Sequence, residues 1–180
     1  MDVYHVVTDR PMYVGQQILF DDDHHSGVYH RVREKMETVK AIYANPWEYD
    51  PETLEHHTAV ALRELALEEV RQRRYPQYPS RLGCLYVSGT LEEAEQWGEF
   101  FAGIGRPTYH IVKLRVEGNC FRADATKCFK GVPDQAENLR LAERYWEAGY
   151  DGTGICEMLV DGRIIVSEIV KEINANIREE

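Results

Sequence analysis

The sequence has no long hydrophobic run, no cysteine motif and no leader-like start. Its apolar stretches are well short of the roughly 20 residues that a bilayer-spanning helix needs. The four cysteines are Cys84, Cys120, Cys128 and Cys156, and no two of them form a C-x-x-C pair. We therefore expect reduced thiols rather than a disulfide or zinc framework. Together these absences predict a soluble protein of the cytoplasm.

Positive charge is scarce, and the familiar nucleotide-binding motifs are missing. The chain has 21 Lys and Arg against 31 Asp and Glu, which gives a net charge of −10. Because phosphate binding relies on clustered Lys and Arg, we expect neither nucleic acid nor an anionic membrane as a partner. The sequence also lacks G-x-G-x-x-G, Walker A and G-x-S-x-G patterns. Rossmann, P-loop and α/β-hydrolase chemistry therefore lose support.

The hydrophobic pattern predicts one domain over residues 1–180, of the α+β class. Strand patterns cover residues 2–8, 17–20, 83–87, 108–116, 154–160 and 163–170. Helix patterns cover residues 26–44, 51–74, 91–101 and 134–148. Asp50 and Pro51 fit the cap and first position of the second helix. The Asp161-Gly162 pair is typical of a hairpin turn, so we expect the last two strands to pair in a largely antiparallel arrangement.

A strand changes into a helix almost without a loop in the stretch "GCLYVSGTLEEAEQWG", residues 83–98. The apolar run stops at Ser88-Gly89, and a helix pattern begins beyond Thr90. Thr90 and Glu93 have the spacing of a capping box. A compact connection between the strand and the helix is enough to account for these residues. The alternative is that Tyr86 and Ser88, fixed at a strand end, face a ligand.

Two histidine pairs raise the question of a metal site. The run "DDDHH", residues 21–25, could bind a divalent cation through its carboxylates and serve a metal-dependent hydrolase, but a solvated acidic turn explains it equally well. His56 and His57 are adjacent on a predicted helix, where neighbours point about 100° apart and do not easily share one ion. We interpret both pairs as structural.

Three segments of the chain resemble the motifs of ADP-ribosyltransferases of the His-Tyr-Glu type. The segment "YHVVTDRPMYVGQQI" resembles the first motif, and "LYVSGTLEEAEQWG" is similar to the second motif of the rifamycin ADP-ribosyltransferases. "GYDGTGICEMLV" followed by "RIIVSEI" is similar to the third. The resemblance implies a bacterial family with an ADP-ribosyltransferase-like fold, in which helices flank a split antiparallel β-sheet core.

The resemblance also implies roles for individual residues. Tyr86 would stack on nicotinamide, Ser88 would support the carboxamide, and His5 would hydrogen-bond a ribose hydroxyl of NAD⁺. Glu157 would bind the nicotinamide ribose and offset positive charge as the glycosidic bond breaks. Asp124, in "NCFRADATK", matches the acid of the rifamycin-modifying enzymes and competes with Glu157 for this role.

The remaining predicted cofactor contacts are Thr8, Arg10 and Arg81. Thr8 lies in the first motif, and the two arginines lie beside the first and second motifs, where they could face the NAD⁺ pyrophosphate. The sequence therefore predicts a protein that binds NAD⁺ and either transfers ADP-ribose to an unknown acceptor or hydrolyses the nicotinamide-ribose bond. The alternative is a non-catalytic nucleotide- or protein-binding module on the same fold.

Overall fold

The computed structural model describes residues 1–8, 10–21 and 23–173. Curled antiparallel sheets with flanking helices confirm the α+β prediction. The chain packs into two compact units. Unit 1 contains residues 1–19, 86–119 and those from 160 onward, and unit 2 contains residues 20–85 and 120–159. That the whole of 1–180 acts as a single domain stays a prediction.

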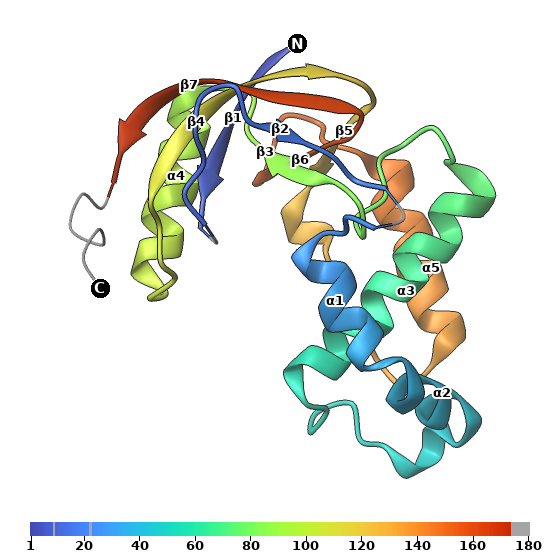
Figure 1. The fold of residues 1–180 in the computed structure, drawn as a ribbon. Coiled ribbons are helices and arrows are strands. Elements are labelled where there is room, and N and C mark those ends of the chain that lie inside the picture. The colour runs from blue at the N-terminus through green and yellow to red at the C-terminus, as the bar shows by residue number, and fades with distance from the viewer. Residues whose placement is uncertain (9, 22, 174–180) are drawn as a thin grey trace. The chain divides into compact units, whose positions relative to one another are not determined.

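Unit 1 is built on a four-stranded antiparallel sheet in the order β1-β4-β7-β2 (Figure 1). The strands are β1 (Asp2–Val7), β2 (Gln17–Ile18), β4 (His110–Glu117) and β7 (Arg163–Glu172). Asp2 lies opposite Arg115 and Val7 lies opposite His110. Because the pairing is antiparallel, the end of β1 and the beginning of β4 meet at the same edge of the sheet.

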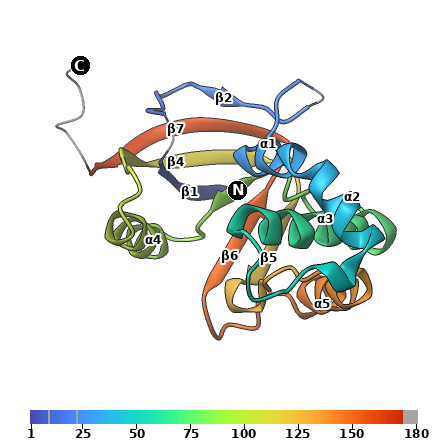
Figure 2. The same cartoon turned by 90° about the horizontal axis from the view of Figure 1, so that it is seen from below.

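Helix α4 (Leu91–Gly103) lies on one side of this sheet (Figure 2). Ala94 of the helix packs against Val6 of β1 and Ile111 of β4 in a buried cluster. The predicted capping box begins the helix: the Thr90 hydroxyl accepts from the Glu93 N–H, and the Glu93 carboxylate accepts from the Thr90 N–H. Local capping chemistry therefore fixes the point at which α4 starts.

Unit 2 is mainly helical. Its helices are α1 (Gly27–Glu34), α2 (Met36–Ala44), α3 (His56–Arg74) and α5 (Gln135–Ala148), with short 3-10 turns η1 (Pro46–Glu48) and η2 (Ala125–Lys127). α3 and α5 pack against each other, and the indole N–H of Trp146 donates to the carbonyl of Leu67 at 2.9 Å. Both residues are buried, so this bond satisfies polar groups inside the core.

A second sheet has the order β3-β6-β5. Its strands are β3 (Leu85–Val87), β5 (Cys120–Asp124) and β6 (Cys156–Val160). β5 and all but the last residue of β6 belong to unit 2, and the chain leaves unit 2 within β3, after Leu85. The sequence patterns had not predicted β5 as a strand.

The predicted hairpin at Asp161-Gly162 is wrong. β6 and β7 lie in different sheets, and β7 pairs with β4 instead. The connection 161–162 lies against the connection 118–119: the Asn119 N–H donates to the Asp161 carboxylate at 3.0 Å, and the Asp161 N–H donates to the Asn119 carbonyl at 3.2 Å. A Cβ on Gly118 would collide with the Asp161 carbonyl, so this close approach requires glycine.

Two predicted helices differ from the structure at their ends. The helix expected over 26–44 is broken at Lys35, whose N–H bonds the carbonyl three residues earlier, and α2 begins beyond it. The helix expected from Pro51 starts at His56, because the Glu55 carboxylate caps it by accepting from two main-chain N–H groups. Among the described residues, no helix has both the length and the apolar character to cross a membrane.

Candidate functional site

His5 and Tyr86 are joined by a hydrogen bond within unit 1. Nδ1 of His5, in β1, lies 2.7 Å from the main-chain carbonyl oxygen of Tyr86, in β3. A carbonyl oxygen only accepts, so Nδ1 carries the hydrogen, and Nε2 of the neutral ring is an unprotonated acceptor. Within the described part of the chain, no hydrogen bond reaches Nε2.

Burial keeps this imidazole uncharged. Loss of solvation is the main reason that the pKa of His5 falls to about 4, and the nearby Arg106 and His110 lower it further. The hydrogen bond to Tyr86 acts in the opposite direction but is outweighed. The His5 ring is therefore neutral at pH 7, with its donor engaged and its acceptor open.

Ser88 lies beside β1 at the corner between β3 and α4. Tyr4 and Ser88 exchange two main-chain hydrogen bonds, of 2.9 Å and 2.7 Å, which fix the corner against β1. The Ser88 side chain is only 6% exposed, and its hydroxyl has no hydrogen-bond partner among the residues that the structure describes. The structure therefore brings together His5, Tyr86 and Ser88, which the sequence had singled out.

Thr8 and Arg10 belong to the segment that leaves β1. Thr8 is half-buried and directly follows the strand, whereas Arg10 is exposed. Two residues beyond Arg10, the Met12 N–H donates to Nε2 of His110 at 3.0 Å. This bond holds the segment at the beginning of β4.

Glu157 lies on β6 in unit 2, where two donors share one of its oxygens. Nη1 of Arg81 lies 2.5 Å and the hydroxyl of Tyr145 lies 2.6 Å from Glu157 Oε1. Oε2 receives no hydrogen bond from the described residues, and the side chain is 14% exposed. Burial raises the pKa of Tyr145 well above its usual value, so the phenol stays protonated and donates.

Arg81 is the centre of a buried ion-pair network. Its Nε and Nη2 bond the Glu64 carboxylate at 2.8 Å and 3.2 Å. Nη1 also bonds the Tyr145 hydroxyl, and Nη2 lies 3.8 Å from the sulfur of Cys128. A guanidinium has five N–H donors, and with the bond to Glu157 all five have acceptors. A contact with pyrophosphate would require Arg81 to give up one of these bonds.

Sequence reasoning missed the acid that completes this network. Glu64 lies on α3 and is 1% exposed, and Arg63 also bonds it through Nε and Nη2, at 3.0 Å and 2.8 Å. Burial alone would raise its pKa, but the two guanidinium groups hold the pKa below its usual value. Glu64 is therefore a buried carboxylate kept ionised by Arg81 and Arg63.

Asp124, the competing acid, ends β5 and caps η2. Its Oδ1 accepts from the N–H and the hydroxyl of Thr126 at 2.9 Å and 2.7 Å, and these bonds are the main cause of its lowered pKa. Lys127 lies 3.7 Å from Oδ2. A structural capping role therefore accounts for the contacts of Asp124.

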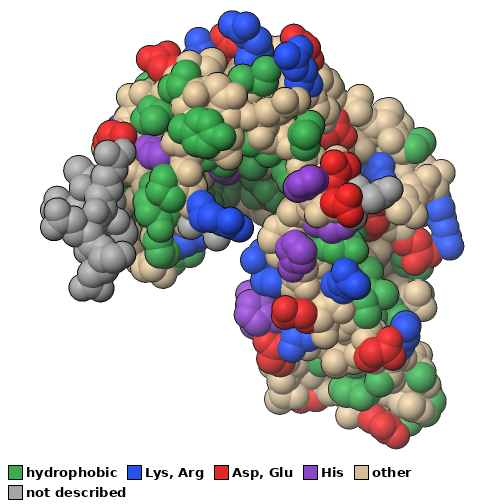
Figure 3. Space-filling model, viewed as in Figure 1, with side chains coloured by type: hydrophobic (Ala, Val, Ile, Leu, Met, Phe, Trp, Pro, Cys, Tyr) green, Lys and Arg blue, Asp and Glu red, His purple; other side chains and the backbone are tan. Residues whose placement is uncertain are grey.

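The "DDDHH" run forms a local turn. The Asp21 carboxylate accepts from the main-chain N–H groups of Asp23 and His24 and lies 2.7 Å from Nδ1 of His24. Residue 22 lies outside the described residues. Figure 3 shows histidine side chains on the face of unit 2 that carries α1, where the ring of His25 stacks on Tyr29. Within the described ranges, no three His, Cys, Asp or Glu side chains are arranged to hold a metal ion.

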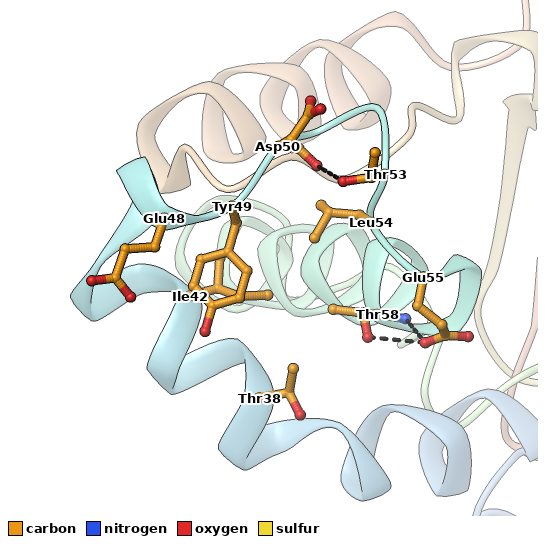
Figure 4. Close-up of a pocket in the computed structure, with 9 residues that line it drawn as sticks. All are labelled: Thr38, Ile42, Glu48, Tyr49, Asp50, Thr53, Leu54, Glu55 and Thr58. Carbon is orange, nitrogen blue, oxygen red and sulfur yellow. Dashed lines mark hydrogen bonds between the residues drawn. The ribbon is translucent and has the colours of Figure 1, made fainter.

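A pocket of about 280 Å³ opens in unit 2 between α2, η1 and the start of α3. Figure 4 shows its lining, in which Tyr49, Leu54 and Ile42 form the apolar part and the Asp50 carboxylate points away. The Glu55 carboxylate at its edge is engaged in capping α3. None of the residues that the sequence predicted for a site lines this pocket.

The fold and the side chains described above define an α+β protein with a neutral imidazole held on its first strand. The chain belongs to the family described as "Protein of unknown function (DUF2441)", whose family model matches residues 3–172. The match covers every residue that the sequence predicted for the site. No curated protein matches the chain.

Proposed function

We propose that this protein binds NAD⁺ and either transfers ADP-ribose to an acceptor or hydrolyses the nicotinamide-ribose bond, as an ADP-ribosyltransferase-like protein. The observation that carries the proposal is the hydrogen bond between His5 and Tyr86. It joins, in one unit, the side chain of His5 to the main chain of Tyr86, and these are two residues that the resemblance assigns to the nicotinamide riboside. The nearby Ser88 hydroxyl adds a third group of the expected kind.

The protonation state of His5 supports a ribose-binding role. An imidazole with Nδ1–H engaged and Nε2 open can accept a hydrogen bond from a sugar hydroxyl. The pKa of about 4 keeps the ring neutral over the physiological range, so it does not repel the positive charge of the nicotinamide ring. In this proposal the Tyr86 ring would stack on the nicotinamide ring, and the Ser88 hydroxyl would hydrogen-bond its carboxamide.

Glu157 is favoured over Asp124 as the catalytic acid. Arg81 and Tyr145 hold one oxygen of Glu157 and leave Oε2 without a protein donor among the described residues. A carboxylate held in this way could offset the positive charge that develops on the ribose as the bond to nicotinamide breaks. Asp124, in contrast, already uses an oxygen to cap η2.

Nicotinamide release from NAD⁺ tests the proposal. We expect the wild-type protein to release nicotinamide and to show a thermal shift with NAD⁺. Glu157→Gln should abolish most of the release and leave NAD⁺ affinity nearly intact, because the charge acts mainly in the transition state. Asp124→Asn, the matched control, should have a smaller effect on release.

The other outcomes are equally informative. Loss of release in Asp124→Asn with full release in Glu157→Gln would assign the acid to Asp124 and leave the reaction class standing. A wild-type protein that neither binds NAD⁺ nor releases nicotinamide would show the proposal to be wrong.

A non-catalytic binding module is the second candidate, and one observation favours it. The Glu157 carboxylate is already paired with the Arg81 guanidinium at 2.5 Å, which reduces the negative charge available to a reacting ribose. This alternative predicts a thermal shift with NAD⁺ and no nicotinamide release at any enzyme concentration.

A further inference from the structure

A buried histidine of unit 1 holds the segment that joins β1 to β2. His110, the first residue of β4, is only 4% exposed, and its Nε2 accepts from the Met12 N–H at 3.0 Å. Because a main-chain N–H can only donate, Nε2 carries no hydrogen in this bond, and Nδ1 carries the hydrogen of the neutral ring. The bond therefore requires an uncharged His110.

Protonation of His110 would set two donors against each other. In the imidazolium form Nε2 also carries a hydrogen, so two N–H groups would face each other at the 3.0 Å that now separates Nε2 from the Met12 nitrogen. A buried polar group that loses its partner costs free energy until it finds another. Moving the segment away from His110 lets water hydrogen-bond both groups.

The charged form of His110 has a partner on the other side of the ring. Oε2 of Glu172, on β7, lies 3.6 Å from Nδ1, and a carboxylate at this distance stabilises an imidazolium. The neighbouring Lys171 does not compensate Glu172 alone, because its ammonium is paired with Glu95 of α4 at 2.7 Å. His110 thus has one partner for each protonation state, Met12 for the neutral ring and Glu172 for the charged ring.

The other ionisable groups near His110 keep their charge as the pH changes around neutrality. His5 on β1 is close enough for the two imidazoles to influence each other, but burial lowers the pKa of His5 to about 4, so its ring stays neutral. Arg106, in the connection before β4, acts on His5 as well and is a permanent cation. Among the described residues of this sheet edge, His110 is therefore the group whose charge can change near neutral pH.

The segment held by His110 buries little of its own surface. Residues 10–14 are exposed except for Met12, which is half-buried, and the side chains of Tyr13 and Val14 are 67% and 59% exposed. Main-chain bonds to β7 begin at Gly15, whose N–H donates to the carbonyl of Val166 at 2.8 Å. A segment with so little buried apolar surface has low local stability, so the loss of one hydrogen bond is enough to shift it.

We propose that the bond between Met12 and His110 is a pH-sensitive switch, which holds residues 10–14 against β4 while His110 is neutral and releases them when His110 takes up a proton. Glu172 then pairs with the charged ring, and the chain from Gly15 onward stays bonded to β7. The switch is independent of the proposed function, because it needs neither NAD⁺ nor catalysis. It acts on the chain that follows the strand of His5.

Hydrogen exchange at the Met12 amide, followed by NMR on the full chain, tests the switch. Between about pH 7.5 and about pH 5, the protection of Met12, corrected for the intrinsic pH dependence of exchange, should fall roughly tenfold, as expected for one hydrogen bond. The imidazole resonances of His110 report its protonation, and the two midpoints should coincide. The Tyr109 amide is the internal control, because it donates to the Val7 carbonyl, which does not titrate, and should stay protected.

Three variants sharpen the test. His110→Gln offers an amide oxygen that accepts at every pH, so the protection of Met12 should no longer depend on pH. Glu172→Gln removes the charge that stabilises the imidazolium from a side chain that is 51% exposed, and the midpoint should move to lower pH. His56→Gln is the matched control, because His56 is exposed and lies in unit 2, and it should leave the Met12 profile unchanged.

Constant protection of Met12 while His110 titrates would overturn the switch, as would a His110 that stays neutral down to about pH 5. A joint loss of protection at Met12 and Tyr109 would also overturn it, because the whole sheet edge would then be opening. Thermal melts verify that the variants are folded. If His110→Gln does not fold, the comparison of the two midpoints in the wild-type protein still decides the question.

Discussion

Unit 1 keeps its half-buried imidazole, that of His5, neutral, whereas unit 2 buries opposite charges and pairs them. In unit 1, desolvation lowers the pKa of His5 to about 4, and its ring retains an open acceptor. In unit 2, Arg81 binds Glu64 and Glu157 in surroundings where its own side chain is 4% exposed. The same physical problem, an ionisable group out of water, has two different solutions in one chain.

This difference indicates which polar side chains hold the fold together and which can bind a ligand. In a network where every donor has an acceptor, binding a ligand would break existing bonds, so Arg81 and Glu64 are best suited to holding α3, β6 and α5 together. A neutral imidazole with an open Nε2 can bind a new partner without such a loss. We therefore expect a polar ligand to bind mainly in unit 1. In the network of unit 2, Glu157 Oε2 is the carboxylate oxygen that receives no hydrogen bond from the described residues.

The largest expected effect comes from removing the shared cation of unit 2. Arg81→Met leaves Glu64 and Glu157 buried without their common partner, and breaking a buried pair in this way costs about 3–5 kcal/mol of unfolding free energy. Urea denaturation measures it. Arg74→Met is the control, because Arg74 pairs with Glu143 at 55% and 47% exposure, where a loss below about 1 kcal/mol is expected. Equal small losses would show that the buried network stabilises no more than a surface pair.

The pH dependence of stability tests the neutral imidazole of unit 1. In the unfolded chain His5 takes up a proton near its ordinary pKa of about 6.5, and in the folded chain only near pH 4. Between these values the unfolded state binds more protons, so stability falls as the pH is lowered through this window, by about 3 kcal/mol at most. Urea denaturation between pH 4 and pH 7 should show this loss.

His5→Gln removes the titrating group and should flatten that part of the pH profile. His56→Gln is the matched control, because His56 is exposed and its side chain makes no ion pair or hydrogen bond among the described residues, so the slope should stay as it is in the wild-type protein. A wild-type profile as flat as that of His5→Gln would mean that the imidazole takes up its proton at the same pH in the folded and unfolded chains, and the contrast between the units would disappear.

Much of the fold follows from local sequence signals. A short run of β-branched and aromatic residues predicted β1, and an alternating pattern predicted β4. The Thr90-Glu93 spacing predicted the start of α4. The failures involve positions where local signals compete with packing. The apolar period runs through Lys35 without a break, although the helix ends there. Asp161-Gly162 has hairpin chemistry, but the long-range pairing of β7 with β4 decides where the chain goes.

The site could be predicted only in part. The sequence placed His5 and Tyr86 on separate strands, but the bond between them depends on pairing across the fold. Glu64 carried a signal: it lies three residues from both Ala61 and Leu67, on the buried face of α3. Such an acid needs a cation, yet nothing local indicates that the cation is Arg81, which follows a loop after the helix.

Each unit has a place where two main-chain segments approach closely, and substitutions there should have a smaller effect on stability. A Cβ on Gly118 would collide with the Asp161 carbonyl in unit 1, and a Cβ on Gly131 would collide with the Ala59 carbonyl in unit 2. Each Gly→Ala change should therefore cost about 1–3 kcal/mol in thermal or urea unfolding. Gly103→Ala is the control, because no atom from another part of the described chain lies within 4 Å of its Cβ position, and it should be neutral or slightly stabilising. Unchanged stability in Gly118→Ala would mean that the two connections are not in contact.

The smallest expected effect concerns the aromatic ring of Tyr86 in unit 1. His5 bonds the main-chain oxygen of Tyr86, so substitutions of the side chain leave that bond possible. If the ring stacks on nicotinamide, Tyr86→Ala should weaken NAD⁺ binding by about 0.5–1.5 kcal/mol, or roughly two- to tenfold, whereas Tyr86→Phe should preserve most of the affinity. Calorimetry measures the NAD⁺ affinity of both variants, and urea denaturation checks that both are folded. An equal loss in both would assign the contact to the hydroxyl and contradict stacking, and no loss in either would remove Tyr86 from the proposed site while leaving His5 and Ser88 in it.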